Sequence, residues 1–140
     1  ILLNVSKNCY QSKVIFPVHP RSFRKLDSKI KKLKNIYFIK PISYLNFIYL
    51  LKNPRAVFTD SGGITEEATY LNVPCLTFRN STERPETIYQ GTNILFDNDS
   101  DKLELYIKKI NSNKWKTTKI PEKWDGQSSK RIVKVIRRLL

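Results

Sequence analysis

The sequence predicts an α/β fold in which a parallel β-sheet is covered by helices on both faces. Two observations carry this prediction: short apolar runs alternate with helix-compatible stretches, and the connections between them are short. This alternation is typical of parallel sheets, because a crossover between parallel strands usually contains a helix. The 140 residues are enough for one domain with a buried core.

Five apolar segments are the predicted strands. They cover residues 13–18, 35–39, 56–59, 74–78 and 93–96. Ligands bind such sheets at the carboxyl ends of the strands. Four candidate positions fall at these ends, namely His19, Pro41, residues 60–63 and residues 79–84.

Helices are predicted between and after the strands. Residues 21–33 place apolar side chains three and four positions apart, which is typical of one amphipathic helix. Ser43 is suited to cap a helix over residues 44–52. Further helices are expected over residues 64–72, 85–90, from a cap at Ser100 or Asp101 to residue 110, and over about 127–140.

The most informative motif is residues 59–68, Thr-Asp-Ser-Gly-Gly-Ile-Thr-Glu-Glu-Ala, read as strand, glycine turn and helix. Glycines allow a ligand to approach the backbone, and the N–H groups and dipole of a helix start favour a phosphate. A carboxylate beside that phosphate, from Glu66 or Glu67, indicates a ligand with neighbouring hydroxyls, such as a nucleoside diphosphate. The alternative is that two acidic residues in a first helical turn only complement the dipole.

Composition and charge indicate the cellular compartment of the protein and limit the classes of partner that it can bind. The formal net charge is +14, yet residues 56–101 hold eight acidic and two basic side chains. The positive charge is therefore peripheral. The basic stretches lack interleaved aromatic residues, which argues against nucleic-acid binding as the main function. No apolar run approaches 18 residues and no signal peptide is recognisable, so we expect a cytoplasmic protein with reduced thiols at Cys9 and Cys75. The chain lacks methionine and begins at Ile1, so we expect a fragment of a longer protein.

The final predicted helix is basic and amphipathic. Its apolar side chains are Ile132, Val133, Val135, Ile136, Leu139 and Leu140. Such a helix can bind a membrane surface or a partner. We favour packing of its apolar side on the sheet or on a neighbouring domain, with no membrane contact.

Five motifs in order resemble the carboxyl-terminal half of non-hydrolysing UDP-N-acetylglucosamine 2-epimerases. They are Pro-Val-His-Pro-Arg, Pro-Ile-Ser-Tyr-Leu-Asn-Phe, the glycine motif, Thr-Glu-Arg-Pro-Glu and Trp-Asp-Gly-Gln-Ser-Ser. The resemblance implies a GT-B-type enzyme with two Rossmann-like domains, of which residues 1–140 are the second. It implies no metal or cofactor, and a full-length homodimer that acts in surface-polysaccharide precursor synthesis.

The resemblance also assigns roles to residues. Ser61, Gly62 and Gly63 match the diphosphate turn, and Glu67 matches the carboxylate that binds the ribose hydroxyls. Phe47 matches an aromatic residue near the uracil.

Two basic residues complete the implied site. His19 matches a histidine that would support the departing diphosphate. Arg84 matches an arginine directed at the nucleotide sugar, with a salt bridge to Glu83 or Glu86 as the alternative. Glu66 is then expected to act on the helix dipole only.

The implied reaction interconverts UDP-N-acetylglucosamine and UDP-N-acetylmannosamine through loss and re-addition of UDP. Its acid–base carboxylates are expected in a missing amino-terminal domain, so the chain alone is expected to be inactive. The alternatives are another GT-B-type UDP-sugar enzyme (a hydrolysing epimerase or a glycosyltransferase), a basic module that binds nucleic acid or other anions, and a non-catalytic relic.

Overall fold

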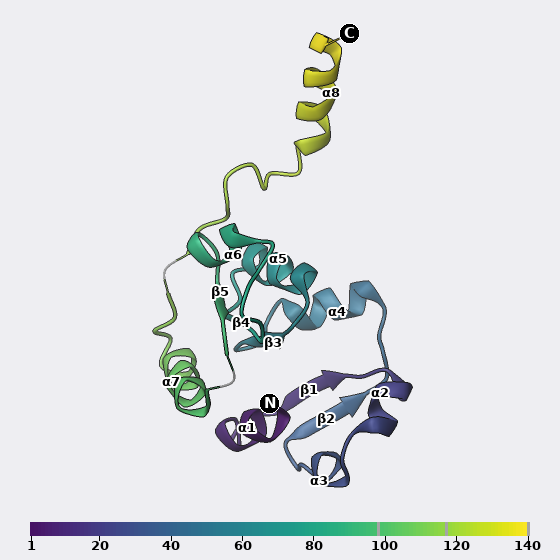
Figure 1. The fold of residues 1–140 in the computed structure, drawn as a ribbon, viewed down its shortest axis with the longest axis vertical. Helices are drawn as coiled ribbons and strands as arrows, with labels where there is room; N and C mark the ends of the chain where they lie inside the picture. Colours follow the sequence, from purple (N-terminus) through teal and green to yellow (C-terminus); the bar gives the residue numbers. More distant parts are fainter. Residues whose placement is uncertain (98, 117, 140) are drawn as a thin grey trace.

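The computed structural model describes residues 1–97, 99–116 and 118–139 (Figure 1). The helices are α1 (Leu2–Asn8), α2 (Pro20–Lys25), α3 (Ser28–Lys31), α4 (Tyr44–Leu51), α5 (Gly62–Tyr70), α6 (Pro85–Tyr89), α7 (Ser100–Asn111) and α8 (Ser128–Leu139). The strands are β1 (Val14–Pro17), β2 (Ile36–Ile39), β3 (Val57–Thr59), β4 (Cys75–Thr77) and β5 (Asn93–Leu95). The five predicted strands are thereby confirmed, each within two residues of its expected ends.

All strand pairs are parallel, as predicted, but the strands are divided between two sheets. One sheet pairs β1 with β2, and the other has the order β3-β4-β5. In the three-stranded sheet, adjacent residues of β4 point to opposite faces. Cys75 packs with Ala68 of α5 on one face, and Leu76 packs with Val5 of α1 and Leu103 of α7 on the other. Helices therefore cover both faces of this sheet, which confirms the predicted fold class.

The larger core cluster connects the two sheets. Its buried members are Val5, Leu76, Phe96, Leu103, Ile107 and Ile110. Val14 of β1 and Phe58 of β3 both pack against this cluster, so the two sheets share one core. Cys75 is buried, and this burial raises the pKa of its thiol to about 12, so the thiol stays protonated as expected of an inert cysteine.

Two helix predictions need correction, and one helix was not predicted. The single helix expected over residues 21–33 is two helices, because Leu26 is extended and Asp27 caps α3 by accepting a hydrogen bond from the Lys29 N–H at 2.7 Å. Helix α7 is capped by Asp99, whose carboxylate accepts hydrogen bonds from two backbone N–H groups, and not by Ser100 or Asp101. Helix α1 was not predicted.

Helix α8 projects away from the rest of the chain (Figure 1). Its apolar side chains are largely in solvent, with Val133 47% and Leu139 81% exposed, so α8 does not pack on the sheet. Leu140, which was expected on the same apolar side, lies outside the described residues. Within the described residues, no helix combines the length and apolar character that a bilayer span requires.

Candidate functional site

The turn from β3 into α5 forms the centre of the candidate site. The Ser61 N–H donates to Oγ1 of Thr59 at 3.0 Å, and the Thr65 hydroxyl donates to the Gly62 carbonyl at 2.6 Å. These bonds fix the turn and the first turn of the helix. Ser61 is the N-cap residue, but its hydroxyl makes no capping hydrogen bond within the described chain. The first N–H groups of α5, which have no intrahelical partner, are therefore open to a ligand.

The chain itself does not require the two glycines at the start of α5. A Cβ atom at Gly62 or at Gly63 would have no described neighbour within 4 Å, and neither residue has a positive φ. Gly91 differs, since a Cβ there would lie 2.7 Å from the Thr87 carbonyl oxygen. Glycine at Gly91 is thus explained by packing within the chain, whereas packing within the chain does not explain the pair in α5.

The first turn of α5 carries no acidic residue. The helix begins at Gly62, two residues earlier than predicted, so Glu66 and Glu67 fall beyond the first turn. The interpretation that these carboxylates only complement the helix dipole is therefore wrong, because the dipole effect is confined to the first turn.

Arg84 lies beside α5. Its Nε is 2.6 Å from Oε1 of Glu66, in an ion pair that connects α5 to the start of α6. The predicted alternative partners were Glu83 or Glu86, and the structure shows neither pair. Arg84 reaches Glu83 only through the backbone, where Nη1 donates to the carbonyl at 3.4 Å. Sequence reasoning missed Glu66 because the pair joins two helices.

Glu67 lines a groove of about 450 Å³. The groove is formed by side chains of α4 and α5 and by one tryptophan of the segment before α8. The lining residues are Tyr44, Ile48, Glu66, Glu67, Tyr70, Leu71 and Trp124. The Glu67 carboxylate raises the pKa of the Tyr44 hydroxyl by hydrogen bonding and by its negative charge. The groove thus combines aromatic surfaces with hydrogen-bond acceptors, a combination that suits a nucleoside.

Two predicted site residues lie apart from this groove. His19 caps α2, where its Nδ1 accepts a hydrogen bond from the Arg21 N–H at 3.2 Å, so that Nε2 is the nitrogen available to a ligand. It is exposed just past the carboxyl end of β1. Phe47 is half-buried in α4 and is not among the groove residues. Within the described chain, no hydrogen bond or ion pair connects either residue to α5.

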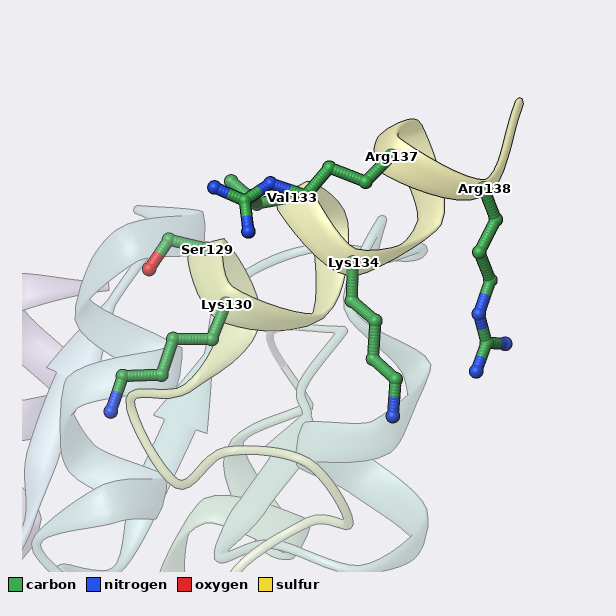
Figure 2. A pocket seen from close by; sticks show the side chains of 6 residues that line it. All are labelled: Ser129, Lys130, Val133, Lys134, Arg137 and Arg138. Carbon is green, nitrogen blue, oxygen red and sulfur yellow. The ribbon is translucent and has the colours of Figure 1, made fainter. Parts of the chain in front are cut away.

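A larger hollow, of about 520 Å³, lies along α8 alone. Figure 2 shows its side chains extending from that single helix, with Lys130, Lys134 and Arg138 reaching outward. Since no second element forms a wall, this surface is a basic helix face rather than an enclosed site. Among the described residues, no three His, Cys, Asp or Glu side chains gather closely enough to hold a metal ion.

Comparison with known proteins agrees with the motifs. The profile of the family described as UDP-N-acetylglucosamine 2-epimerase matches residues 1–137. The chain belongs to this family. It is 42% identical over 139 residues to the UDP-N-acetylglucosamine 2-epimerase of Methanococcus maripaludis. That match covers 95% of this chain but only 37% of the relative, so the chain spans little more than a third of the length of this epimerase.

Solved epimerase structures show the same fold. The crystal structure of the Methanocaldococcus jannaschii UDP-GlcNAc 2-epimerase, in complex with UDP-GlcNAc and UDP, matches with a TM-score of 0.80 and 38% identity over 98% of this chain and 40% of that one. The epimerase from Neisseria meningitidis bound to UDP-GlcNAc matches with a TM-score of 0.74 and 25% identity, again over 98% and 40%. The predicted resemblance and the GT-B-type, Rossmann-like fold are thereby confirmed.

Proposed function

We propose that the chain is the UDP-binding part of a non-hydrolysing UDP-N-acetylglucosamine 2-epimerase. The whole enzyme would interconvert UDP-N-acetylglucosamine and UDP-N-acetylmannosamine for surface-polysaccharide precursors, as a cytoplasmic homodimer. The single observation that carries the proposal is the start of α5. There two glycines with free space around them begin the first turn, the N-cap Ser61 makes no side-chain capping hydrogen bond within the described chain, and Glu67 follows beside a groove.

Each part of UDP has a partner in this proposal. The Ser61 hydroxyl and the N–H groups of Gly62 and Gly63 bind the diphosphate, where the helix dipole and the unpaired donors favour negative charge. Glu67 accepts hydrogen bonds from the two ribose hydroxyls. Phe47 contacts the uracil, and Arg84 donates to phosphate oxygens through its guanidinium fork.

His19 would support the leaving group. Its Nδ1 is already engaged by the Arg21 N–H, so Nε2 is the atom that would donate to a phosphate oxygen as the bond from the sugar to UDP breaks. The chain's own residues then bind UDP and stabilise its negative charge. The proton transfers at the sugar would be performed by carboxylates of an amino-terminal domain, so the 140 residues alone would bind UDP without turning over substrate.

The test is a calorimetric titration of the chain with UDP. Glu67→Gln should weaken UDP binding about ten- to a hundredfold, because it removes a charge-assisted contact. Glu122→Gln is the matched control, since the Glu122 side chain is 84% exposed, does not line the groove, and among the described residues makes only a 3.9 Å ion pair with the exposed Lys123. It should leave the affinity unchanged.

A second ligand identifies the contact. With 2′-deoxy-UDP, the unsubstituted chain should bind more weakly than with UDP, and Glu67→Gln should cause a smaller loss of affinity than it causes with UDP, because only the 3′-hydroxyl remains for Glu67. If a folded chain binds UDP no better than it binds inorganic diphosphate, or if Glu67→Gln binds with full affinity, the nucleotide proposal is wrong. An affinity that falls steeply with salt and ignores Glu67 would instead identify a general anion-binding module.

A further inference from the structure

We propose that Glu66 is a positioning residue that holds the Arg84 guanidinium beside the proposed diphosphate-binding turn at residues 61–63. The proposal rests on the function proposed above and adds a role that the sequence did not predict. Its basis is the ion pair between Arg84 Nε and Glu66 Oε1 at 2.6 Å.

The backbone of Arg84 is held on both sides. Its N–H donates to Oγ1 of Thr82 at 3.1 Å, and its carbonyl accepts a hydrogen bond from the Thr87 hydroxyl at 2.7 Å. The side chain is long and 44% exposed, so without a partner it would sample many rotamers. Glu66 is therefore the contact that determines where the guanidinium lies.

The ion pair also leaves the two terminal nitrogens of the guanidinium available to a ligand. Glu66 occupies Nε, which leaves the two terminal nitrogens of the fork. One of them makes only a long contact of 3.4 Å with the Glu83 carbonyl. That edge has the geometry that binds two oxygens of a phosphate.

Helix geometry places the pair on the correct side of α5. Gly62 and Glu66 are four residues apart, so they lie on the same face of the helix. The arginine held by Glu66 is therefore on the face that begins at Gly62. A diphosphate seated on the first N–H groups of α5 would meet the helix dipole and this guanidinium together.

The sign of a charge effect distinguishes positioning from simple electrostatics. A carboxylate near a diphosphate repels it, so removal of an unpaired acidic residue should strengthen binding. If Glu66 instead acts through Arg84, neutralising Glu66 should weaken binding although a negative charge has been removed.

The experiment is a double-mutant cycle with calorimetric UDP titrations at fixed salt. We expect Glu66→Gln to weaken UDP binding about two- to fivefold, the range of an exposed ion pair, and Arg84→Gln to weaken it about tenfold or more. In the double variant, the Glu66 substitution should cause no further loss. Glu66 also lines the groove, so uridine, which has no phosphate, serves as the second ligand. Uridine affinity should be unchanged in Glu66→Gln.

Several results would overturn the proposal. UDP binding by Glu66→Gln that equals or exceeds the wild-type affinity would show that Glu66 is only a repulsive charge. An equal loss of UDP affinity with and without Arg84 would show that Glu66 acts independently of it, and a loss of uridine affinity would indicate a distorted groove. These outcomes leave the proposed function intact where UDP binding still depends on Glu67. A wild-type chain that does not bind UDP would overturn both proposals.

Discussion

Substitution of Gly62 by alanine separates the two physical reasons for a glycine at the start of α5. A Cβ atom there would meet no described atom of the chain within 4 Å, and the φ angle is not positive. Alanine reduces the entropy of the unfolded chain and is the best helix former. We therefore expect Gly62→Ala to stabilise the fold by about 0.4–1 kcal/mol, which raises Tm by roughly 2–6 °C for a domain of this size.

The same substitution should weaken UDP binding. In the proposed complex a phosphate oxygen approaches the Gly62 backbone at hydrogen-bond distance, and a methyl group in that space displaces it. Loss of one charge-assisted N–H contact corresponds to about 1.5–3 kcal/mol, or a ten- to hundredfold higher Kd. A substitution that raises Tm while it lowers affinity is unusual for a structural position and typical of a ligand site.

The assay pairs thermal unfolding with calorimetric UDP titration of the same samples. Gly91→Ala is the control, because it should lower Tm and leave the Kd unchanged at temperatures where the chain is folded. The reasoning is refuted if Gly62→Ala raises Tm and binds UDP with the wild-type Kd. The glycine would then serve neither the fold nor the ligand, and the diphosphate would have to bind elsewhere.

Two further predictions follow from local contacts. Gly91→Ala should destabilise the chain by about 1–3 kcal/mol in chemical denaturation, because its Cβ would lie 2.7 Å from the Thr87 carbonyl oxygen and against the Thr69 side chain. An unchanged denaturation midpoint would show that the backbone around Gly91 can shift without loss of stability. The Arg131 guanidinium, 2.9 Å from the Asp125 carboxylate, holds the pKa of that carboxyl well below its usual range. A depressed carboxyl pKa contributes stability above the unfolded pKa of about 4, and this stability is lost as pH falls through the folded pKa. In NMR titrations the Asp125 pKa should therefore rise toward about 4 in Arg131→Gln, with the Gln127 N–H still holding it below that value.

The central motif was predictable from sequence because its chemistry is local. A strand, two glycines and a helix start within a few residues, and the apolar runs on either side are strong signals. The position of the helix start was less accessible. The sequence prediction began α5 at Ile64, because glycine is a poor helix former, whereas Ser61 provides the N-cap and the two glycines form the first turn.

Contacts between distant segments could not be predicted. The sequence predicts Glu83 or Glu86 as the alternative partner of Arg84, whereas in the structure Arg84 pairs with Glu66 on another helix. The irregular segment after α7 has no periodicity to interpret. It is held by side-chain bonds to backbone, such as the Trp115 indole N–H to the Thr92 carbonyl at 2.8 Å. Such bonds depend on the folded position of a carbonyl and leave no pattern in the sequence.

The two adjacent glutamates of α5 illustrate how position decides the role of identical side chains. Successive residues of a helix are rotated by about 100°, so Glu66 and Glu67 face different neighbours. Glu66 faces a cation, Arg84, and their charges offset each other, which makes a carboxylate near a diphosphate tolerable. Glu67 faces the neutral phenol of Tyr44, and no described cation lies within 4 Å of it. The Glu67 carboxylate is therefore available to accept hydrogen bonds from hydroxyl groups, such as those of a ribose. A ligand that consists of an anion alone would be repelled by this carboxylate.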